Sequence, residues 1–394
     1  MTRLIIFLAF AGSLLCQTKS SVEKAWGLAA NGQREQAVSL LQKVIASNPN
    51  DADARLLLGS LFMDAGRGQE AIAQLTEAVK LRPRSAEAQN ALGEAYNSAG
   101  EAKAAREPFE KAVAIKPDYG VAQMNLGEVL LNSGELAPAS EHLNRAIKLL
   151  PRGDDSAYTR YLLAKLYTAQ NDVPQAAETL QQAIAMRPEF PQAWSDLGEA
   201  RKTLLDDNAA LAAFTRAVEL APNDAVAQYR LGAEYLDMNK PRIAVEHLEI
   251  AYRLSPEDQS TLNALQSALR QDNRTSEADE IKQKLTELLL MKDKANQDAL
   301  AAANLNNEGA RLEHAGDLPD ALKKYQAAVK LAPNNVPMRV NYAVALLRIG
   351  KWTDGLNELH AALLMDPSNA KIQEAMKEAL AQAPANTIPD WGRR

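Results

Sequence analysis

The chain has 394 residues, of which 46% are hydrophobic, 24% charged and 5% aromatic, a balance typical of a folded protein built from helices rich in small residues. The formal net charge is −6, and lysines and arginines stand singly among acidic residues. Because no basic stripe is present to release counterions from phosphates, we expect no nucleic-acid partner.

Residues 1–21 predict an export signal. Arg3 precedes an apolar run from Leu4 to Leu15, which has the length of a signal-peptide core and is well short of the roughly 20 residues that span a membrane. A buried first helix is the other interpretation, but the run is apolar on every side. We therefore expect an exported chain, periplasmic or extracellular, with no transmembrane span after cleavage.

Cys16 is the single cysteine and closes this run. It suggests a second hypothesis, membrane anchoring through lipidation of Cys16, since the end of the run resembles a bacterial lipoprotein signal. Leu15, however, stands where that pattern has Gly, Ala or Ser. One cysteine forms no disulfide within the chain, so we expect packing alone to stabilise the fold.

From about residue 18 the sequence repeats every 34 residues. The prolines that follow this period are Pro49, Pro83, Pro117, Pro151, Pro188, Pro222 and Pro256, with one step of 37, and Pro333 and Pro367 resume it after a gap. Within 86–119, Gly93 and Tyr96 fall on one face of a helix, and Phe109 falls on a second helix that Pro117 ends. One such hairpin cannot bury its own apolar face, so we expect the copies to stack.

This repeat pattern resembles that of the tetratricopeptide repeat (TPR) family, whose repeat is a 34-residue helix-turn-helix. The resemblance covers about residues 18–369 and implies an all-α fold, with the repeats stacked into a right-handed superhelical solenoid. We expect about seven repeats in 22–258 and two more in 302–369. Segment 370–383 predicts an amphipathic helix that closes the stack, and 384–394 a flexible tail.

Residues 259–301 depart from the period. Gln266 stands where the glycine belongs, nine extra residues precede the next repeat, and neither Gly nor Pro occurs from Glu257 to Glu308. We expect a degenerate repeat whose second helix runs on from about Ser276 toward Glu313. Both a joint between the two arrays and a drifted repeat that still stacks fit this segment.

The motifs of common enzyme classes are missing. The four histidines lack the spacing of a zinc site, and neither a phosphate-binding glycine loop nor a nucleophile elbow occurs. His142 and His247 occupy one position of the repeat, which predicts that they are copies of one structural slot. We expect no catalytic residue, no metal and no cofactor, and therefore a protein that is not an enzyme.

Positions 2, 5, 9 and 12 of each repeat share a second face of its first helix, rotated away from the packing face. We call it the first-helix face, and the resemblance implies that it lines the concave side of the superhelix, where partner segments lie. The predicted contact residues are Glu87, Asn90, Glu94, Asn97, Met124, Glu128, Leu131, Tyr158, Tyr161, Lys165, Gln192, Ser195, Glu199, Lys202 and Tyr229. Tyrosines suit a binding surface, and the acidic residues favour a basic or neutral partner.

The leading hypothesis is a non-enzymatic exported scaffold that binds an extended peptide or a helix of a partner protein on its concave face. Two alternatives remain. One is a structural or lipid-anchored assembly factor of a cell-envelope machine, of the pilus or outer-membrane type. The other is an accessory subunit of a modifying enzyme.

Overall fold

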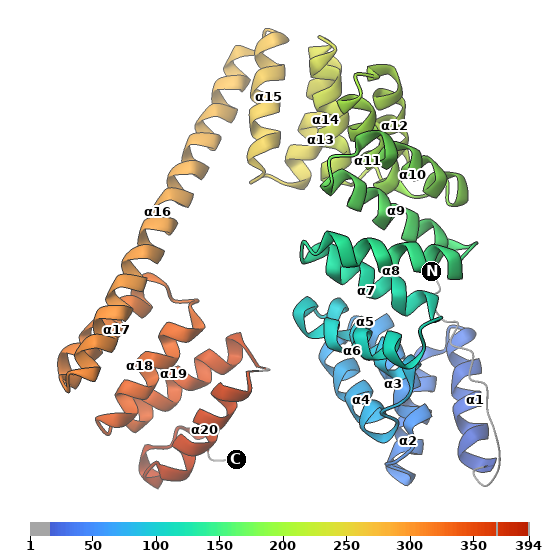
Figure 1. Ribbon diagram of the computed structural model, residues 1–394. Helices are drawn as coiled ribbons and strands as arrows, with labels where there is room; N and C mark the ends of the chain where they lie inside the picture. The colour runs from blue at the N-terminus through green and yellow to red at the C-terminus, as the bar shows by residue number, and fades with distance from the viewer. Residues whose placement is uncertain (1–15, 368, 393–394) are drawn as a thin grey trace. The chain divides into compact units, whose positions relative to one another are not determined.

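The computed structural model describes residues 16–367 and 369–392, and side chains from residue 21 onward. All regular structure in this range is helical, which confirms the all-α prediction (Figure 1). The predicted export signal, apart from the first residues of α1, and the side chain of Cys16 lie outside the described part. Contacts divide the chain into an N-terminal unit, 1–256, and a C-terminal unit, 257–394.

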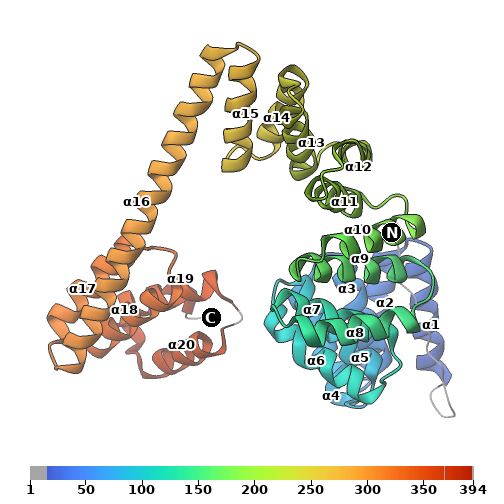
Figure 2. The ribbon, with the colours of Figure 1, turned by 45° about the horizontal axis from the view of Figure 1, so that its top comes forward.

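The N-terminal unit is a series of two-helix hairpins, stacked one on the next (Figures 1 and 2). Its helices are α1 (Cys16–Ala30), α2 (Arg34–Ser47), α3 (Ala52–Asp64), α4 (Gly68–Leu81), α5 (Ala86–Ser98), α6 (Ala102–Ile115), α7 (Gly120–Asn132), α8 (Leu136–Leu149), α9 (Asp154–Ala169), α10 (Val173–Met186), α11 (Pro191–Thr203), α12 (Asp207–Leu220), α13 (Ala225–Asp237) and α14 (Pro241–Leu254).

The C-terminal unit has fewer helices and one of unusual length. It consists of α15 (Gln259–Gln271), α16 (Thr275–His314), α17 (Leu318–Leu331), α18 (Val336–Arg348), α19 (Trp352–Met365) and α20 (Ala370–Gln382), followed by short 3-10 helices at Ala385–Thr387 and Asp390–Gly392. Helix α20 forms where the sequence predicts an amphipathic closing helix, and it buries Ile372, Met376 and Ala379.

Each hairpin closes around a small residue of its first helix. A Cβ atom at Gly93 would lie 2.5 Å from the Phe109 ring, and one at Gly198 would lie 2.4 Å from the Phe214 ring. The missing side chain therefore lets the two helices approach while the ring fills the layer between them. In the degenerate repeat the same place holds Gln266, which is tolerated because the residue sixteen positions on is an exposed lysine rather than a bulky core residue.

Side chains at the fourth position of several repeats seal the loop before them. Gln123 Nε2 donates to the carbonyl of Pro117 at 2.8 Å, and Gln228 Nε2 donates to that of Pro222 at 2.8 Å. In another repeat the donor is Trp194 Nε1, bound to the carbonyl of Pro188 at 2.8 Å. The proline that ends one repeat is thus tied to the first helix of the next.

The predicted histidine slot is confirmed. His142 Nδ1 lies 2.6 Å from Gln123 Oε1, and His247 Nδ1 lies 2.8 Å from Gln228 Oε1. Each glutamine already donates through its amide nitrogen, so its oxygen accepts and the histidine Nδ1 is the donor. The two histidines therefore link the glutamine, which is bonded to the proline carbonyl of the preceding loop, to the second helix of the same hairpin.

The continuous helix predicted from Ser276 toward Glu313 is also confirmed, because α16 runs unbroken for 40 residues. Its beginning packs against α15 and buries Ile281 and Leu285, and its end packs against α17 around Gly309. No side chain is buried between residues 286 and 301. One helix therefore closes the hairpin with α15 and opens the hairpin with α17.

Residues 384–392, expected to belong to a flexible tail, instead lie against α19 and α20. The Trp391 ring stacks on His360 with centroids 4.2 Å apart, and Trp391 Nε1 donates to Asn357 Oδ1 at 3.0 Å. Ile388 joins Trp391 against the core of these helices. These two apolar side chains therefore cover part of the apolar face of α19 and α20.

Within residues 16–367 and 369–392, eleven residues have a positive φ, and all but one of them are glycine or asparagine. Leu205, between α11 and α12, is different: its φ is 60° and its surface is 88% exposed. A leucine in the left-handed region crowds its own backbone. This turn is therefore strained compared with the equivalent turn at Asn171.

We expect Leu205→Asn to stabilise the α11–α12 hairpin by about 1 kcal/mol, because asparagine tolerates this backbone conformation better. The measurement is the melting temperature of the full chain together with hydrogen exchange of α11 and α12 amides. The reciprocal control, Asn171→Leu, should weaken the α9–α10 hairpin by a similar amount. If hydrogen exchange of α11 and α12 is not slower in Leu205→Asn than in the wild type, the turn at Leu205 is not strained. Slower exchange of α9 and α10 in Asn171→Leu would contradict the strain as well.

The histidine slots predict a pH dependence of stability. Burial lowers the pKa of His142 and His247, and Glu141 and Glu246 oppose this more weakly. The unfolded chain takes up these protons from about pH 6.5 downward, and the folded chain only at lower pH, so their stabilising contribution is complete above that value and is lost as the pH falls.

Between about pH 7.5 and about pH 5.5, we expect the melting temperature of the wild type to fall more than that of His142→Gln/His247→Gln. Glutamine fits this slot, because Gln74 accepts from Arg55 at the equivalent place. Circular dichroism melts in matched buffers make the comparison, and equal losses in both proteins would refute a role for the two rings.

Candidate functional site

The predicted contact residues of the first-helix face differ in how accessible they are. Of its predicted contact residues, Asn97, Lys165, Gln192 and Glu199 are exposed, Asn90, Met124, Leu131 and Ser195 are buried, and Glu87, Glu94, Glu128, Tyr158, Tyr161, Lys202 and Tyr229 are half-buried. A partner can therefore reach the exposed and half-buried members directly. Their role in binding stays a prediction.

Between α5 and α7, three polar side chains form one cluster. Asn125 Nδ2 donates to Asn90 Oδ1 at 3.0 Å and to Glu94 Oε1 at 3.0 Å. Asn90 Nδ2 also donates to Glu94 Oε1, at 3.2 Å. Both asparagines are buried. The cluster satisfies their polar groups and fixes α5 against α7.

Tyrosines make the next connections. Tyr158 of α9 donates its hydroxyl to Glu128 Oε1 of α7 at 2.6 Å. Tyr161, one turn further along α9, lies next to Asp196 of α11; burial first, and then the charge of Asp196 and a hydrogen bond to it, raise the pKa of the Tyr161 hydroxyl. The Tyr161 phenol therefore stays protonated and, like the Tyr158 hydroxyl, can donate to a carboxylate.

Ion pairs connect α11 to α13. Arg230 Nη1 donates to Ser195 Oγ at 2.7 Å and to Asp196 Oδ1 at 2.9 Å, and Arg230 Nε lies 3.3 Å from Glu199 Oε1. Several acceptors thus share one guanidinium, an arrangement that suits its planar set of donors.

Lys202 makes a second connection between the same helices. Its Nζ lies 3.0 Å from Glu234 Oε2 and 2.5 Å from Asp237 Oδ2. Burial acts to lower the pKa of Lys202, but the hydrogen bonds to Asp237 and Glu234 raise it overall. The carboxylate of Glu234, which is almost completely buried, is neutralised by this contact.

The partners of the predicted residues were missed by the sequence analysis. Asn125 and Arg230 lie at the sixth position of their repeats, 35 residues after Asn90 and Ser195. The same spacing joins Asn341 to Asn306 in the C-terminal unit, at 3.0 Å. A search for polar residues paired at 35 residues, rather than at the period of 34, would have found this set.

Aromatic side chains gather beside α9. The Phe190 ring lies 4.9 Å from the Tyr161 ring and 6.5 Å from the Tyr158 ring, measured between centroids. The guanidinium of Arg187 stacks on Phe190, 3.5 Å from its centroid. Lys165 Nζ lies 5.9 Å from the Tyr161 centroid. This aromatic cluster adjoins the part of the first-helix face carried by α9.

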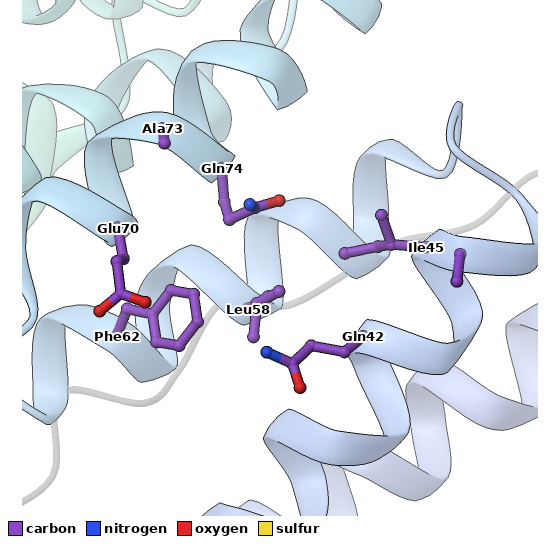
Figure 3. Close-up of a pocket in the computed structure, with 8 residues that line it drawn as sticks. Gln42, Ile45, Leu58, Phe62, Glu70, Ala73 and Gln74 are labelled. Carbon is purple, nitrogen blue, oxygen red and sulfur yellow. The ribbon is translucent and has the colours of Figure 1, made fainter. Parts of the chain in front are cut away.

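An open groove of about 350 Å³ lies elsewhere, between α2 and α4 (Figure 3). Its lining residues are Gln42, Ile45, Ala46, Leu58, Phe62, Glu70, Ala73 and Gln74. Its one carboxylate, Glu70, is bound by Arg67 Nη2 at 2.5 Å. The groove therefore presents an apolar floor without a free acid or base for chemistry.

The described residues form neither a metal site nor a membrane-spanning helix. No group of three or more His, Cys, Asp and Glu side chains is placed to hold a metal ion in that part of the chain. Among the helices from α1 to α20, none has both the length and the apolar character needed to cross a membrane.

This chain is similar to several known proteins, but only over part of the length of each. The anaphase-promoting complex subunit CDC16 of Saccharomyces cerevisiae is 21% identical over 226 residues, covering 57% of this chain and 26% of that protein. The anaphase-promoting complex subunit cut9 of Schizosaccharomyces pombe is 25% identical over 237 residues, covering 59% and 34%. Protein FlbA of Caulobacter vibrioides is 30% identical over 172 residues, covering 43% and 27%. The chain thus spans about a quarter to a third of the length of these relatives.

Structure and family models agree on the repeat. A tetratricopeptide repeat protein from Parabacteroides merdae has a similar fold, with a TM-score of 0.51 and 14% identity, over 64% of this chain and 99% of that one. Models described as tetratricopeptide repeat match residues 22–75, 56–120 and 161–225, residues 118–189, and residues 312–380. These matches cover more than half of the sequence, and the chain therefore belongs to the tetratricopeptide repeat family.

Proposed function

We propose that this protein is an exported, non-enzymatic scaffold that binds a segment of a partner protein, an extended peptide or a helix, along its first-helix face. The observation that carries this proposal is the series of side-chain bonds from α5 to α13. These bonds fix the face before a partner arrives, so little of it has to be ordered on binding.

The exposed chemistry of this face suits a protein ligand. Tyr158 and Tyr161 offer apolar ring surface with a polar tip, and such rings are enriched where proteins meet. Asn97 and Gln192 are exposed amides that can donate to and accept from the backbone of a partner segment. Two of the relatives are named as subunits of a complex, which supports a role based on binding.

We also propose that the role is stoichiometric. Two charged residues of the face are engaged in ion pairs with residues beside it: Glu199 with Arg230, which also pairs with Asp196, and Lys202 with Glu234 and Asp237. Such pairs hold adjacent helices in register rather than transfer protons. This reasoning supports a scaffold over an enzyme.

Export is proposed from Arg3 and the apolar run that follows it. The first buried side chain described in α1 is Val22, so cleavage at or before residue 21 would keep every side chain that is described as buried in that helix. We expect mass spectrometry of the mature protein from its source cells to give an N-terminus between residues 17 and 22 without a lipid. A retained Met1 would refute export, whereas a diacylglyceryl group on Cys16 would establish the anchored alternative.

Binding on the first-helix face is tested with bulky substitutions at its exposed amides. We expect Asn97→Trp/Gln192→Trp to lower the capture of crosslinked partners by about tenfold, because two indoles obstruct the path of the bound segment. The matched control is Asn208→Trp/Gln181→Trp, which makes the same replacements at exposed positions of the second helices α12 and α10.

The measurement is quantitative mass spectrometry of crosslinked partners from the source organism, with circular dichroism confirming that each variant is folded. The control should retain wild-type capture. If both double variants capture the same proteins in the same amounts, the first-helix face is not the binding surface.

A further inference from the structure

The start of α11 differs from that of most first helices. The N-cap side chain accepts a hydrogen bond from the backbone of its own helix at Asp51, Ser85, Asp224, Asp258, Asn335 and Asn369. The N-cap residue of α11, Phe190, makes no such bond, and neither do Tyr119 before α7 and Gly153 before α9. Phe190 is distinguished by its burial, because it is 4% exposed and its ring packs beside Tyr158 and Tyr161.

A second departure lies three residues earlier. In two other repeats the residue before the proline is a cation that pairs with an acid at the second position of the same repeat. Arg82 Nη1 lies 2.5 Å from Asp53 Oδ1, and Lys116 Nζ lies 3.5 Å from Glu87 Oε1. Arg187 occupies this place before Pro188, but the second position of its repeat is a tyrosine.

Arg187 consequently lacks its acidic partner. Among the described residues Arg187 has no hydrogen-bond or ion-pair partner; its Nε is buried, and its terminal amino groups are the donors that a ligand can reach. The carboxylates that contact Tyr158 and Arg230 are already engaged, because Glu128 accepts from Tyr158 and Asp196 accepts from Arg230. A ligand that brings an acceptor to the terminal amino groups therefore gains a charge-assisted hydrogen bond that no side chain of the described residues supplies.

We propose that Arg187, with Tyr158 and Tyr161 beside it, forms a subsite for a carboxylate carried by the bound partner segment. The carboxylate belongs either to an Asp or Glu side chain or to the C-terminus of the segment. This inference rests on the proposed function and specifies the chemistry of the partner.

The geometry suits that ligand. Stacking on Phe190 uses the face of the guanidinium, and the N–H donors lie in its plane, so they remain directed past the ring. Two parallel donors match the two oxygens of a carboxylate. The rings of Tyr158 and Tyr161, which pack with Phe190, provide apolar surface for the residue that carries the acid.

The test uses an array of synthetic octapeptides of random sequence, each made with a free C-terminal carboxylate and as the C-terminal amide, probed with the full chain. We expect the retained peptides to be enriched in Asp or Glu, or to bind only as the free acid, and the two forms identify the source of the carboxylate. Arg187→Gln should weaken their binding by about tenfold. The control, Arg216→Gln, removes a surface cation paired with Glu219 and should change nothing.

Arg187→Met provides a second variant, because its side chain covers Phe190 without a charge and keeps the loop packed. If Arg187 only covers Phe190, the retained peptides will show the same preference for a carboxylate with Arg187→Gln and with Arg187→Met as with the wild type. That result would overturn the subsite and leave the proposed function standing. If the array retains no peptide, or Asn97→Trp/Gln192→Trp leaves peptide binding unchanged, the proposed function fails together with the subsite.

Discussion

A two-helix hairpin leaves one apolar face uncovered, and the architecture follows from the need to cover it. In the N-terminal unit the next hairpin does so, while Gly93 and Gly198 let the two helices of their own hairpins approach closely. In the C-terminal unit α20 packs on α19, and Ile388 and Trp391 add apolar side chains to the same core.

The same stacking creates the surface on which we place function. Once the first helices lie side by side, their outward positions meet across each junction, and polar side chains there need partners. Asn125, Tyr158 and Arg230 supply them, each bonding to the preceding first helix. A face built in this way is stiff, and what remains exposed on it is available to another chain without prior rearrangement.

Periodicity explains how much the sequence could predict. Contacts that recur leave prolines, glycines or histidines at a fixed spacing, so the hairpins and the His142 and His247 slots were predictable. The unbroken α16 was predictable for the opposite reason, because glycine and proline are missing where the period breaks. Contacts made once leave no such spacing. The packing of Trp391 on His360 and of Phe190 on Tyr161 joins residues far apart in the sequence, and only the folded chain brings them together. The polar pairs spaced by 35 residues are intermediate: they recur in several repeats, but each joins the fifth position of one repeat to the sixth position of the next, so a comparison of equivalent positions overlooks them.

The uncovered middle of α16 has a mechanical consequence. No side chain of residues 286–301 is buried, so this span depends mainly on hydrogen bonds within its own helix and gains little from packing on other helices. Under tension we expect it to unwind more readily than the packed ends of α16, because unwinding it exposes no buried side chain. Its length would then grow from about 24 Å as a helix to about 53 Å as an extended chain. Such a span would act as an extensible tether while the hairpins that α16 forms with α15 and α17 keep their structure.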